Sequence, residues 1–330
     1  MRETALTNWG TLHGNHFCGC PVLLTGGAGF IGSHLAEALV SLGGVVTVLD
    51  DLSGGDRKNL ASFGPVEFVE GSILDMSLLS RCVRGKRYIF HLAALGSVPA
   101  SVEQPRKYHD VDATGTLNVL EAARQAGTQR VIYSASSSAY GTNGVPWTET
   151  MPVLPCSPYA AAKQYGEGLL RAYSNSYGMD TASLRYFNIF GPRQNANSAY
   201  AAVIAAFAKA FLAGKQPIIF GDGAQSRDFT FVHNAVHANL LAARAAKPSN
   251  GEVINVGTGG QVTVNHLASI MASALGRPDL KPVYQAERAG DLKHSYADLA
   301  RARAMLGYEP IVGFEAGLEV TLAWYKSVLS

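Results

Sequence analysis

Residues 22–32 have the sequence Val22-Leu23-Leu24-Thr25-Gly26-Gly27-Ala28-Gly29-Phe30-Ile31-Gly32. The apolar run at its start predicts a short buried strand, and the periodic apolar residues from Ile31 to Leu42 predict a helix directly after it. Glycines at 26, 29 and 32 allow a tight turn, close approach of the backbone to a pyrophosphate, and close packing of helix on strand. The segment therefore predicts a strand–turn–helix unit whose helix start offers unpaired N–H groups to phosphates.

A carboxylate, Asp50, ends the next predicted strand, which begins at Val45. In this context a carboxylate accepts the ribose hydroxyls, so the loop is predicted to bind a dinucleotide. A 2′-phosphate about 4 Å from it would cost on the order of 4 kcal/mol at an effective dielectric of 20, which favours NAD over NADP. The next arginine, Arg57, is seven positions on. The alternative is that Asp50 or Asp51 only caps the following turn.

The α/β rhythm continues through the first half of the chain. Further strands are predicted near 66–69, 88–90, 131–133 and 181–186, and further helices near 75–84, 112–126 and 160–177. This alternation predicts a doubly wound parallel Rossmann sheet with right-handed crossovers. We expect a loosely held N-terminal extension at 1–20, an NAD-binding domain at 21–186, and a smaller α/β domain at 187–330 that mainly binds substrate. Segments near 232–258 are candidates to return to the first domain.

Composition excludes several classes of protein. Charged residues make up only 16% of the 330 residues and the net charge is +2, which excludes a disordered chain and a polybasic nucleic-acid binder. The four cysteines are scattered and lack the spacing of a zinc site, so we expect no bound metal. We expect the cysteines to be reduced thiols. The most apolar helix-like stretch, near 199–214, is too short to span a bilayer. We expect a cytoplasmic protein without nucleic-acid or membrane partners.

Tyr159 and Lys163 have the four-residue spacing that places two side chains on one helical face. Holding a tyrosine as phenolate at pH 7 costs about 4 kcal/mol, which a lysine one turn away can help to offset. The serines of segment 134–141 follow a predicted parallel strand, where ligands bind, and one hydroxyl can share a substrate proton with Tyr159. The alternative for Tyr159 and Lys163 is that they are surface residues on an ordinary helix. The alternative for the serine segment is a polar loop without a catalytic role.

These motifs, in this order, resemble the extended short-chain dehydrogenase/reductase family, also called the NAD-dependent epimerase/dehydratase family. The resemblance rests on residues 25–32, on His91-Leu92-Ala93-Ala94, on the serine segment, on Tyr159 with Lys163, and on Arg185-Tyr186-Phe187-Asn188. Within the family the chain is most similar to UDP-N-acetylglucosamine 4-epimerases. Segments 94–99, 199–204, 221–229 and 288–291 carry that finer likeness.

The resemblance implies a reaction and a role for each matching residue. Tyr159 would take the proton of the sugar C4 hydroxyl, helped by Ser136, while Lys163 holds the nicotinamide ribose. The residues implied to bind NAD are Gly26, Gly29, Phe30, Ile31, Gly32, Asp50, Asp51, Ser53, Gly54, Ser72, Ile73, Leu92, Ala93, Ala94, Ser134, Tyr159, Lys163 and Tyr186. Those implied to bind the UDP-sugar are Gly96, Ser97, Ser137, Ser138, Asn188, Ala202, Val203, Arg227, Arg288, Asp291 and Ser295. The resemblance also implies a homodimer formed through the helices that contain Asp112 and Ala160.

Ser295 carries the finest prediction. The resemblance implies that this position lies against the C2 side of the sugar, where a tyrosine restricts the pocket to plain hexoses. A serine leaves room for an N-acetyl group, so interconversion of UDP-GlcNAc and UDP-GalNAc is predicted. A sugar pocket large enough for an N-acetyl group can also accept UDP-glucose and UDP-galactose.

Several alternatives stay open. A 4-epimerase of UDP-glucose or UDP-glucuronate is the nearest one. A nucleotide-sugar dehydratase or decarboxylase needs a carboxylate in the loop after the catalytic hydroxyl, where this chain has Ser137-Ser138-Ala139. A non-catalytic NAD-binding sensor is a remote alternative, because such proteins usually lose the Tyr or the Lys.

Three residues depart from the family pattern. Ser72 replaces the usual aspartate, which leaves the hydrogen bond to adenine in doubt. Asp112 stands where asparagine is common, and His233 where an acidic residue is usual. We expect none of them to touch the chemistry of Tyr159 and Lys163.

Overall fold

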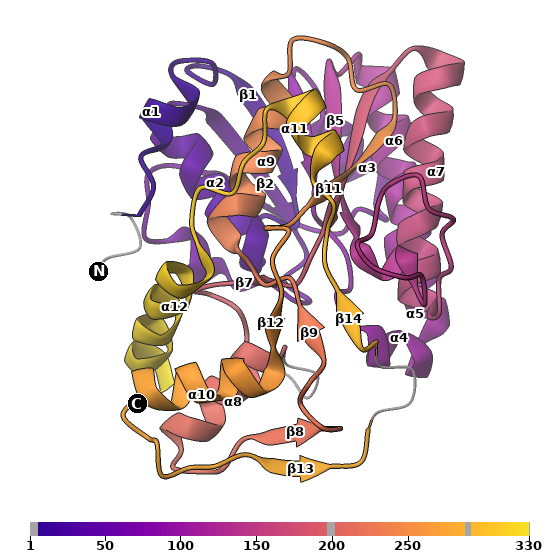
Figure 1. The fold of residues 1–330 in the computed structure, drawn as a ribbon. Coiled ribbons are helices and arrows are strands. Elements are labelled where there is room, and N and C mark those ends of the chain that lie inside the picture. Colours follow the sequence, from indigo (N-terminus) through magenta and orange to yellow (C-terminus); the bar gives the residue numbers. More distant parts are fainter. Residues whose placement is uncertain (1–5, 197–201, 288–291, 330) are drawn as a thin grey trace.

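The computed structural model describes residues 6–196, 202–287 and 292–329. Its largest sheet has seven parallel strands in the order β11-β6-β5-β4-β1-β2-β3 (Figure 1). The strands are β1 (Pro21–Thr25), β2 (Val45–Asp50), β3 (Glu67–Glu70), β4 (Tyr88–His91), β5 (Arg130–Ser136), β6 (Asp180–Tyr186) and β11 (Glu252–Val256). The predicted doubly wound parallel sheet is confirmed.

Helices cover both faces of this sheet, as parallel strands require. One face carries α2 (Phe30–Ser41), α9 (Val232–Arg244) and α11 (Ala300–Leu306), and the other carries α3 (Met76–Cys82), α6 (Gly115–Ala126) and α7 (Pro158–Tyr177) (Figure 1). Two hydrophobic cores fill the two layers. Where the sequence predicted one helix over 112–126, a π-helical turn at His109–Thr114 precedes α6.

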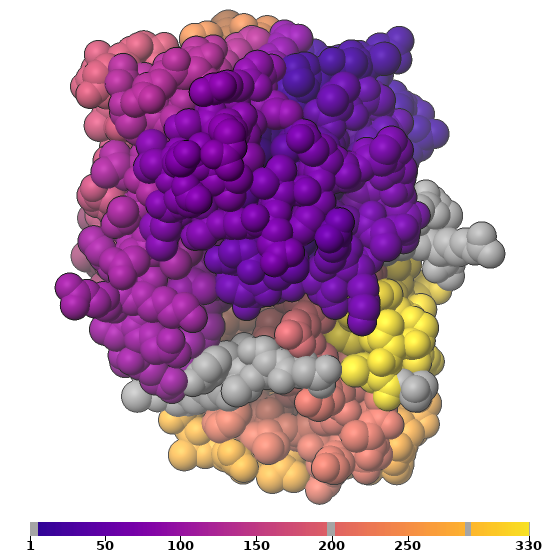
Figure 2. Space-filling view, turned by 180° about the vertical axis from the view of Figure 1, so that it is seen from behind, coloured from indigo at the N-terminus to yellow at the C-terminus, as the bar shows by residue number. Residues whose placement is uncertain are grey.

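The later segments build a smaller body at the carboxyl edge of the sheet. It contains α8 (Val203–Leu212), α10 (Val264–Ala274) and α12 (Phe314–Leu329), which share a third hydrophobic core. Strands β8 (Ile218–Phe220) and β13 (Val283–Gln285) pair with each other, and β9 (Ser226–Arg227) lies between β12 (Val262–Thr263) and β14 (His294–Ser295). Figure 2 shows this salmon, orange and yellow part below the indigo and purple body.

The N-terminal segment packs against α9, so the expectation that it is loosely held is wrong for residues 6–20. Helix α1 (Trp9–His13) is followed by Phe17, which is fully buried. The Thr7 hydroxyl is hydrogen-bonded to Nδ1 of His233 at 2.8 Å, and Nε2 of His13 to Nδ1 of His237 at 3.1 Å. This packing could not be predicted from the polar composition, because the contacts are made by histidines and single aromatic residues rather than by an apolar run.

Disulfides, membrane-spanning helices and metal-binding clusters are all absent from the described residues. All four cysteines are free thiols, of which Cys20 and Cys82 are buried. Over the described ranges, no helix combines the length and apolar character needed to cross a membrane. The same ranges contain no group of three or more His, Cys, Asp or Glu side chains that could hold a metal ion.

Candidate active site

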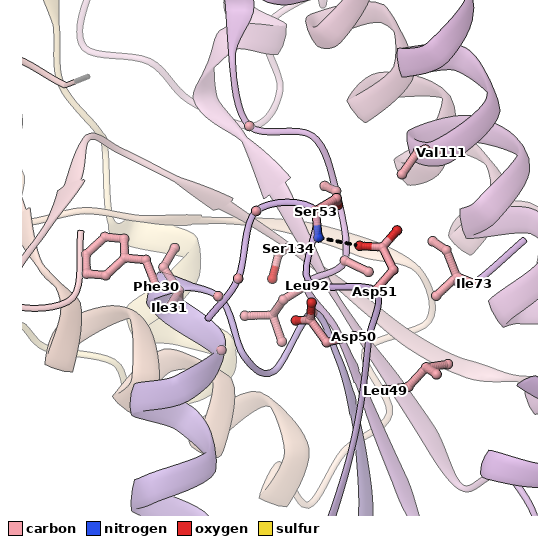
Figure 3. Close-up of a pocket in the computed structure, with 18 of the residues that line it drawn as sticks. Phe30, Ile31, Leu49, Asp50, Asp51, Ser53, Ile73, Leu92, Val111 and Ser134 are labelled. Atoms are coloured by element: carbon pink, nitrogen blue, oxygen red, sulfur yellow. Dashed lines mark hydrogen bonds between the residues drawn. The ribbon is translucent and has the colours of Figure 1, made fainter. Parts of the chain in front are cut away.

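A cavity of about 320 Å³ opens at the carboxyl edge of the large sheet. Every residue expected to bind the cofactor lines it, as does Gly96, which was expected to bind substrate. Figure 3 shows Phe30 and Ile31 at the start of α2 on one side, with Asp50, Asp51 and Ile73 across from them. Lining residues that the sequence analysis did not single out are Leu49, Gly55, Gly71, Val111 and Ala135.

The glycine loop between β1 and α2 has no room for side chains. Gly26 has φ +73°, and a Cβ there would lie 2.5 Å from the backbone nitrogen of Ala93. A Cβ on Gly32 would lie 2.2 Å from the carbonyl oxygen of Gly26. Gly29 is the N-cap of α2, and because it has no side chain, the first N–H groups of the helix stay available to a ligand. This cradle fits the pyrophosphate of a dinucleotide.

Asp50 is fixed by the backbone at the end of β2. Its Oδ2 accepts a hydrogen bond from the Ala28 N–H at 2.9 Å, and its Oδ1 accepts one from the Leu52 N–H at 2.9 Å. Burial raises the pKa of this carboxyl, and the two N–H groups oppose the rise. Each oxygen can accept a further hydrogen bond, so the turn-capping alternative and a contact to ribose hydroxyls are compatible.

Tyr159 and Lys163 lie on one face of α7, as the sequence predicted. The helix begins with Pro158 in its first turn and with Ser157 as N-cap, whose hydroxyl accepts from the Ala160 N–H at 3.1 Å. Lys163 Nζ donates to the Ser134 carbonyl oxygen at 3.0 Å and lies 5.9 Å from the centre of the Tyr159 ring. The helix thus brings phenol and ammonium to the same wall of the cavity.

The protein's own groups favour the neutral phenol at Tyr159. Burial raises the pKa of Tyr159 to about 12, a hydrogen bond with Ser136 opposes the rise, and the charge of Asp112 adds to it. Burial lowers the pKa of Lys163, while the charges of Asp112 and Glu167 oppose that fall. Desolvation is therefore the dominant influence on both groups.

The serine segment comprises the last residues of β5 and the turn that follows it. Ser136 Oγ accepts hydrogen bonds from the Ser138 N–H at 3.2 Å and the Ser138 hydroxyl at 2.9 Å. Ser137 begins a single 3₁₀ turn that ends at Tyr140. Deeper in the cavity, the hydroxyls of Ser134 and Tyr186 are 3.0 Å apart.

Three of the residues expected to bind substrate, Asn188, Arg227 and Ser295, lie close together in the smaller body and the segment that leads into it. Asn188, in a left-handed conformation with φ +35°, has Nδ2 3.5 Å from the hydroxyl oxygen of Ser295. Ser295 pairs with Arg227 across β14 and β9 and is only 5% exposed. Ala202 is the N-cap of α8 and is exposed, with the half-buried Val203 next to it. Arg288 and Asp291 lie outside the described residues.

Tyr108 joins the site without having been singled out in the sequence. Its ring meets the Tyr159 ring edge-on at 6.4 Å between centroids, and its hydroxyl oxygen accepts from the Ser97 N–H at 3.2 Å. Ser97 also caps a short helix, α4 (Val98–Glu103), with its hydroxyl. No motif marks Tyr108, because its position depends on the packing of two short helices against α7.

Asp112 corrects an expectation. It is 1% exposed in the π-helical turn, and its charge acts on both Tyr159 and Lys163. The expectation that this departure leaves the Tyr159–Lys163 pair untouched is therefore wrong. The usable signal was the carboxylate itself, which stands at a position where the family commonly has a neutral amide.

Known proteins match this chain over almost its whole length. The model of the NAD-dependent epimerase/dehydratase family matches residues 22–257. A UDP-glucose 4-epimerase of Mycolicibacterium smegmatis is 41% identical over 92% of this chain and 98% of its own. The solved structure of a UDP-N-acetylglucosamine 4-epimerase from Methanobrevibacter ruminantium, in complex with UDP-N-acetylmuramic acid, is 41% identical with a TM-score of 0.90, covering 94% of this chain and 99% of its own. The UDP-glucose 4-epimerase of Thermotoga maritima, solved with UDP-glucose, is 38% identical with a TM-score of 0.89, covering 94% and 100%.

Proposed function

Because the chain belongs to the NAD-dependent epimerase/dehydratase family, we propose that it is a UDP-sugar 4-epimerase that interconverts UDP-GlcNAc and UDP-GalNAc. The observation that carries the choice of substrate is Ser295. It is a small buried side chain beside Asn188 and Arg227, two residues expected to bind the substrate. The family resemblance implies that this position lies against C2 of the sugar, where a serine leaves room for an N-acetyl group.

Proton transfer falls to Tyr159. When bound, NAD supplies a reversible hydride acceptor for C4 of the sugar. The phenolate form of Tyr159 would accept the C4 hydroxyl proton and later return it. The Lys163 ammonium and the positive nicotinamide ring of bound NAD would favour this form over the neutral phenol that burial alone favours. The Ser136 hydroxyl would share that proton with the phenol. Lys163, held at the Ser134 carbonyl oxygen, presents its remaining N–H groups to the nicotinamide ribose. The glycine cradle and Asp50 hold the pyrophosphate and the adenosine ribose.

Epimerisation further requires that the 4-keto sugar turn over while its nucleotide stays bound. We expect Asn188 and Arg227 to hold the diphosphate, because the planar guanidinium of Arg227 suits two phosphate oxygens at once. Ala202 and Val203, at the start of α8, are proposed to line the uracil pocket. The sugar is then left free to present either face to the same Tyr159.

The competing enzymes of the same family are less well supported. A dehydratase or decarboxylase would need an acid next to Ser136, and the following turn contains Ser137, Ser138 and Ala139. A non-catalytic NAD sensor does not explain why Tyr159 and Lys163 both line the cavity. An epimerase restricted to UDP-glucose or to UDP-glucuronate differs from the proposal only in the sugar pocket.

The deciding experiment is an epimerase assay followed by the anomeric proton signals in NMR. UDP-GlcNAc, UDP-GalNAc, UDP-glucose and UDP-galactose are each incubated with the protein, with UDP-glucuronate as a fifth substrate. We expect UDP-GlcNAc and UDP-GalNAc to interconvert. Turnover of UDP-glucose alone, or of UDP-glucuronate alone, would refute the N-acetyl assignment.

Two variants of Ser295 connect this result to the structure. Ser295→Tyr should abolish turnover of the N-acetylated pair and retain that of any plain hexose that the native enzyme accepts. Ser295→Ala, the matched control, keeps the side chain small and should retain both activities. If Ser295→Tyr still turns over UDP-GlcNAc at the native rate, Ser295 does not border the N-acetyl group.

The same family relationship supports a homodimer in which α6 and α7 of two copies meet. Tyr165, on the outer face of α7, is 48% exposed and would lie in that interface. Light scattering coupled to gel filtration should give twice the mass of one chain, and Tyr165→Glu should lower it to the monomer value. A native protein that elutes as a monomer would exclude this assembly.

A further inference from the structure

Lys163 carries its charge in a nearly dry environment. It is 4% exposed, and among the described residues its Nζ has one hydrogen-bond acceptor, the Ser134 carbonyl oxygen. The faces of the Tyr133 and Tyr159 rings, with centres 5.0 and 5.9 Å from Nζ, add only weak attraction. An anionic group near such a buried ammonium favours its charged form.

The charges of two buried carboxylates, Asp112 and Glu167, oppose the fall in the pKa of Lys163, and one of these carboxylates is already paired. Glu167, one turn further along α7, accepts from Arg185 with both oxygens, from Nε at 2.7 Å and from Nη2 at 2.6 Å. This bidentate pair is itself buried, so the charge of Glu167 is balanced by that of Arg185.

Asp112 is the other carboxylate, and its hydrogen bonding is incomplete. Oδ1 accepts from the Leu95 N–H at 2.8 Å, while Oδ2 is buried and has no hydrogen-bond partner among the described residues. The π-helical turn that holds Asp112 packs against α7, and its neighbour Val111 lines the same cavity as Lys163. We propose that Asp112 is the counter-charge that keeps Lys163 an ammonium, which makes it a positioning residue for the cofactor-binding lysine. Its positioning role, unlike the counter-charge itself, rests on the function proposed for Lys163.

The neighbouring titratable groups agree with this assignment. Burial raises the pKa of Asp112, and the Lys163 charge and the Leu95 N–H oppose the rise. His91 also faces Lys163, but burial and the lysine's charge lower the pKa of this imidazole to about 3, so it stays neutral. Tyr108 and Tyr133 face Asp112, and burial raises the pKa of both phenols, so neither supplies an anion at neutral pH. Asp112 therefore remains as the counter-charge.

The test compares Asp112→Asn with Asp110→Asn. An asparagine at 112 can still accept from the Leu95 N–H but carries no charge, and Asp110 is an exposed carboxylate on the same turn. Lysines labelled with ¹³C at Cε are titrated by NMR in the purified protein, and the Lys163 signal is identified by its loss in Lys163→Met. In Asp112→Asn we expect the Lys163 midpoint to fall by about one pH unit or more. In Asp110→Asn it should stay at the native value.

An unchanged Lys163 midpoint in Asp112→Asn overturns the proposal, even if the variant melts at a lower temperature, because a structural role alone would change only the melting temperature. If Asp112→Asn does not fold, Asp112→Ser also removes the charge and keeps an acceptor, and the same fall is expected. The titration needs no substrate, so its result is independent of the epimerase assay. If the protein epimerises no UDP-sugar, the proposed function is refuted. A shifted Lys163 midpoint in Asp112→Asn would still support the counter-charge assignment.

Discussion

Lys163 Nζ donates a hydrogen bond to the carbonyl oxygen of Ser134, 3.0 Å away, and so ties the first turns of α7 to the carboxyl end of β5. The side-chain hydroxyl of the same Ser134 lies 3.0 Å from that of Tyr186, at the end of β6. Strand, helix and neighbouring strand are thereby held together at one wall of the cavity. Because Tyr159 lies one turn before Lys163, this attachment also fixes where its phenol can meet a substrate.

Replacing the phenol of Tyr159 tests its role as the proton acceptor. Tyr159→Phe should keep bound NAD, since the glycine cradle, Asp50 and Lys163 still hold it, and should lose about 10²- to 10⁴-fold in kcat. Tyr165→Phe, on the exposed face of the same helix, is the matched control and should turn over at the native rate. Epimerisation is followed by NMR, and bound nucleotide is identified after the protein is denatured. Near-native kcat in Tyr159→Phe would remove the phenol from the reaction.

The sequence predicts the sheet and the cofactor loop well, since both depend on local patterns. The apolar strands and the glycines at 26, 29 and 32 identify a strand–turn–helix unit without any knowledge of distant contacts. By contrast, Tyr108 and Asp112 act through the packing of a π-helical turn against α7, and no spacing rule marks such a turn. The packing of the N-terminal segment could not be predicted for a similar reason, because its partners His233 and His237 are more than 200 positions away in the sequence.

The cradle can be tested by adding one methyl group. In Gly32→Ala the new Cβ would lie 2.2 Å from the Gly26 carbonyl oxygen, so the loop must move, at a cost of about 1–3 kcal/mol, and NAD should bind weakly. Gly168→Ala adds the same methyl group to an exposed helix position with nothing within 4 Å. It should stabilise the protein by up to about 1 kcal/mol, because alanine favours helix. Urea unfolding and NAD titration measure both effects, and Gly32→Ala with native NAD affinity would contradict the assignment of the loop.

Asp50 should determine the choice between NAD and NADP. The carboxylate repels a 2′-phosphate, so Asp50→Asn should lower the preference for NAD by about ten- to a thousandfold. NAD itself should also bind more weakly, because an acceptor for the ribose hydroxyls is lost. Asp75→Asn changes an exposed carboxylate that caps α3 and should leave the preference unchanged. Isothermal titration with each cofactor gives the ratio of Kd values, and an unaltered ratio in Asp50→Asn would assign the discrimination to other residues.

The buried contact between His13 and His237 makes the stability of the N-terminal packing depend on pH. Burial, with the neighbouring charges, lowers the pKa of His13 to about 3 and that of His237 to about 4, from 6.5 for an unperturbed histidine. Above pH 6.5 both rings are neutral whether packed or released, so pH has little effect on the packing. As pH falls below 6.5 the released rings gain protons that the packed rings cannot, and the packed state loses up to about 1.4 kcal/mol per pH unit for each histidine.

His13→Gln should reduce this loss, because an amide can hydrogen-bond His237 and does not titrate. We expect the free energy of unfolding in urea to fall between pH 6.5 and pH 4.5 in the native protein. In His13→Gln it should fall less steeply, by up to about 1.4 kcal/mol per pH unit, while His237 and the buried His91 keep contributing. His109→Gln removes an exposed histidine on the far side of the sheet and should reproduce the native slope. Equal slopes in His13→Gln and the native protein would mean that the N-terminal segment stays packed when its histidines are protonated, and that the acid sensitivity arises elsewhere in the fold.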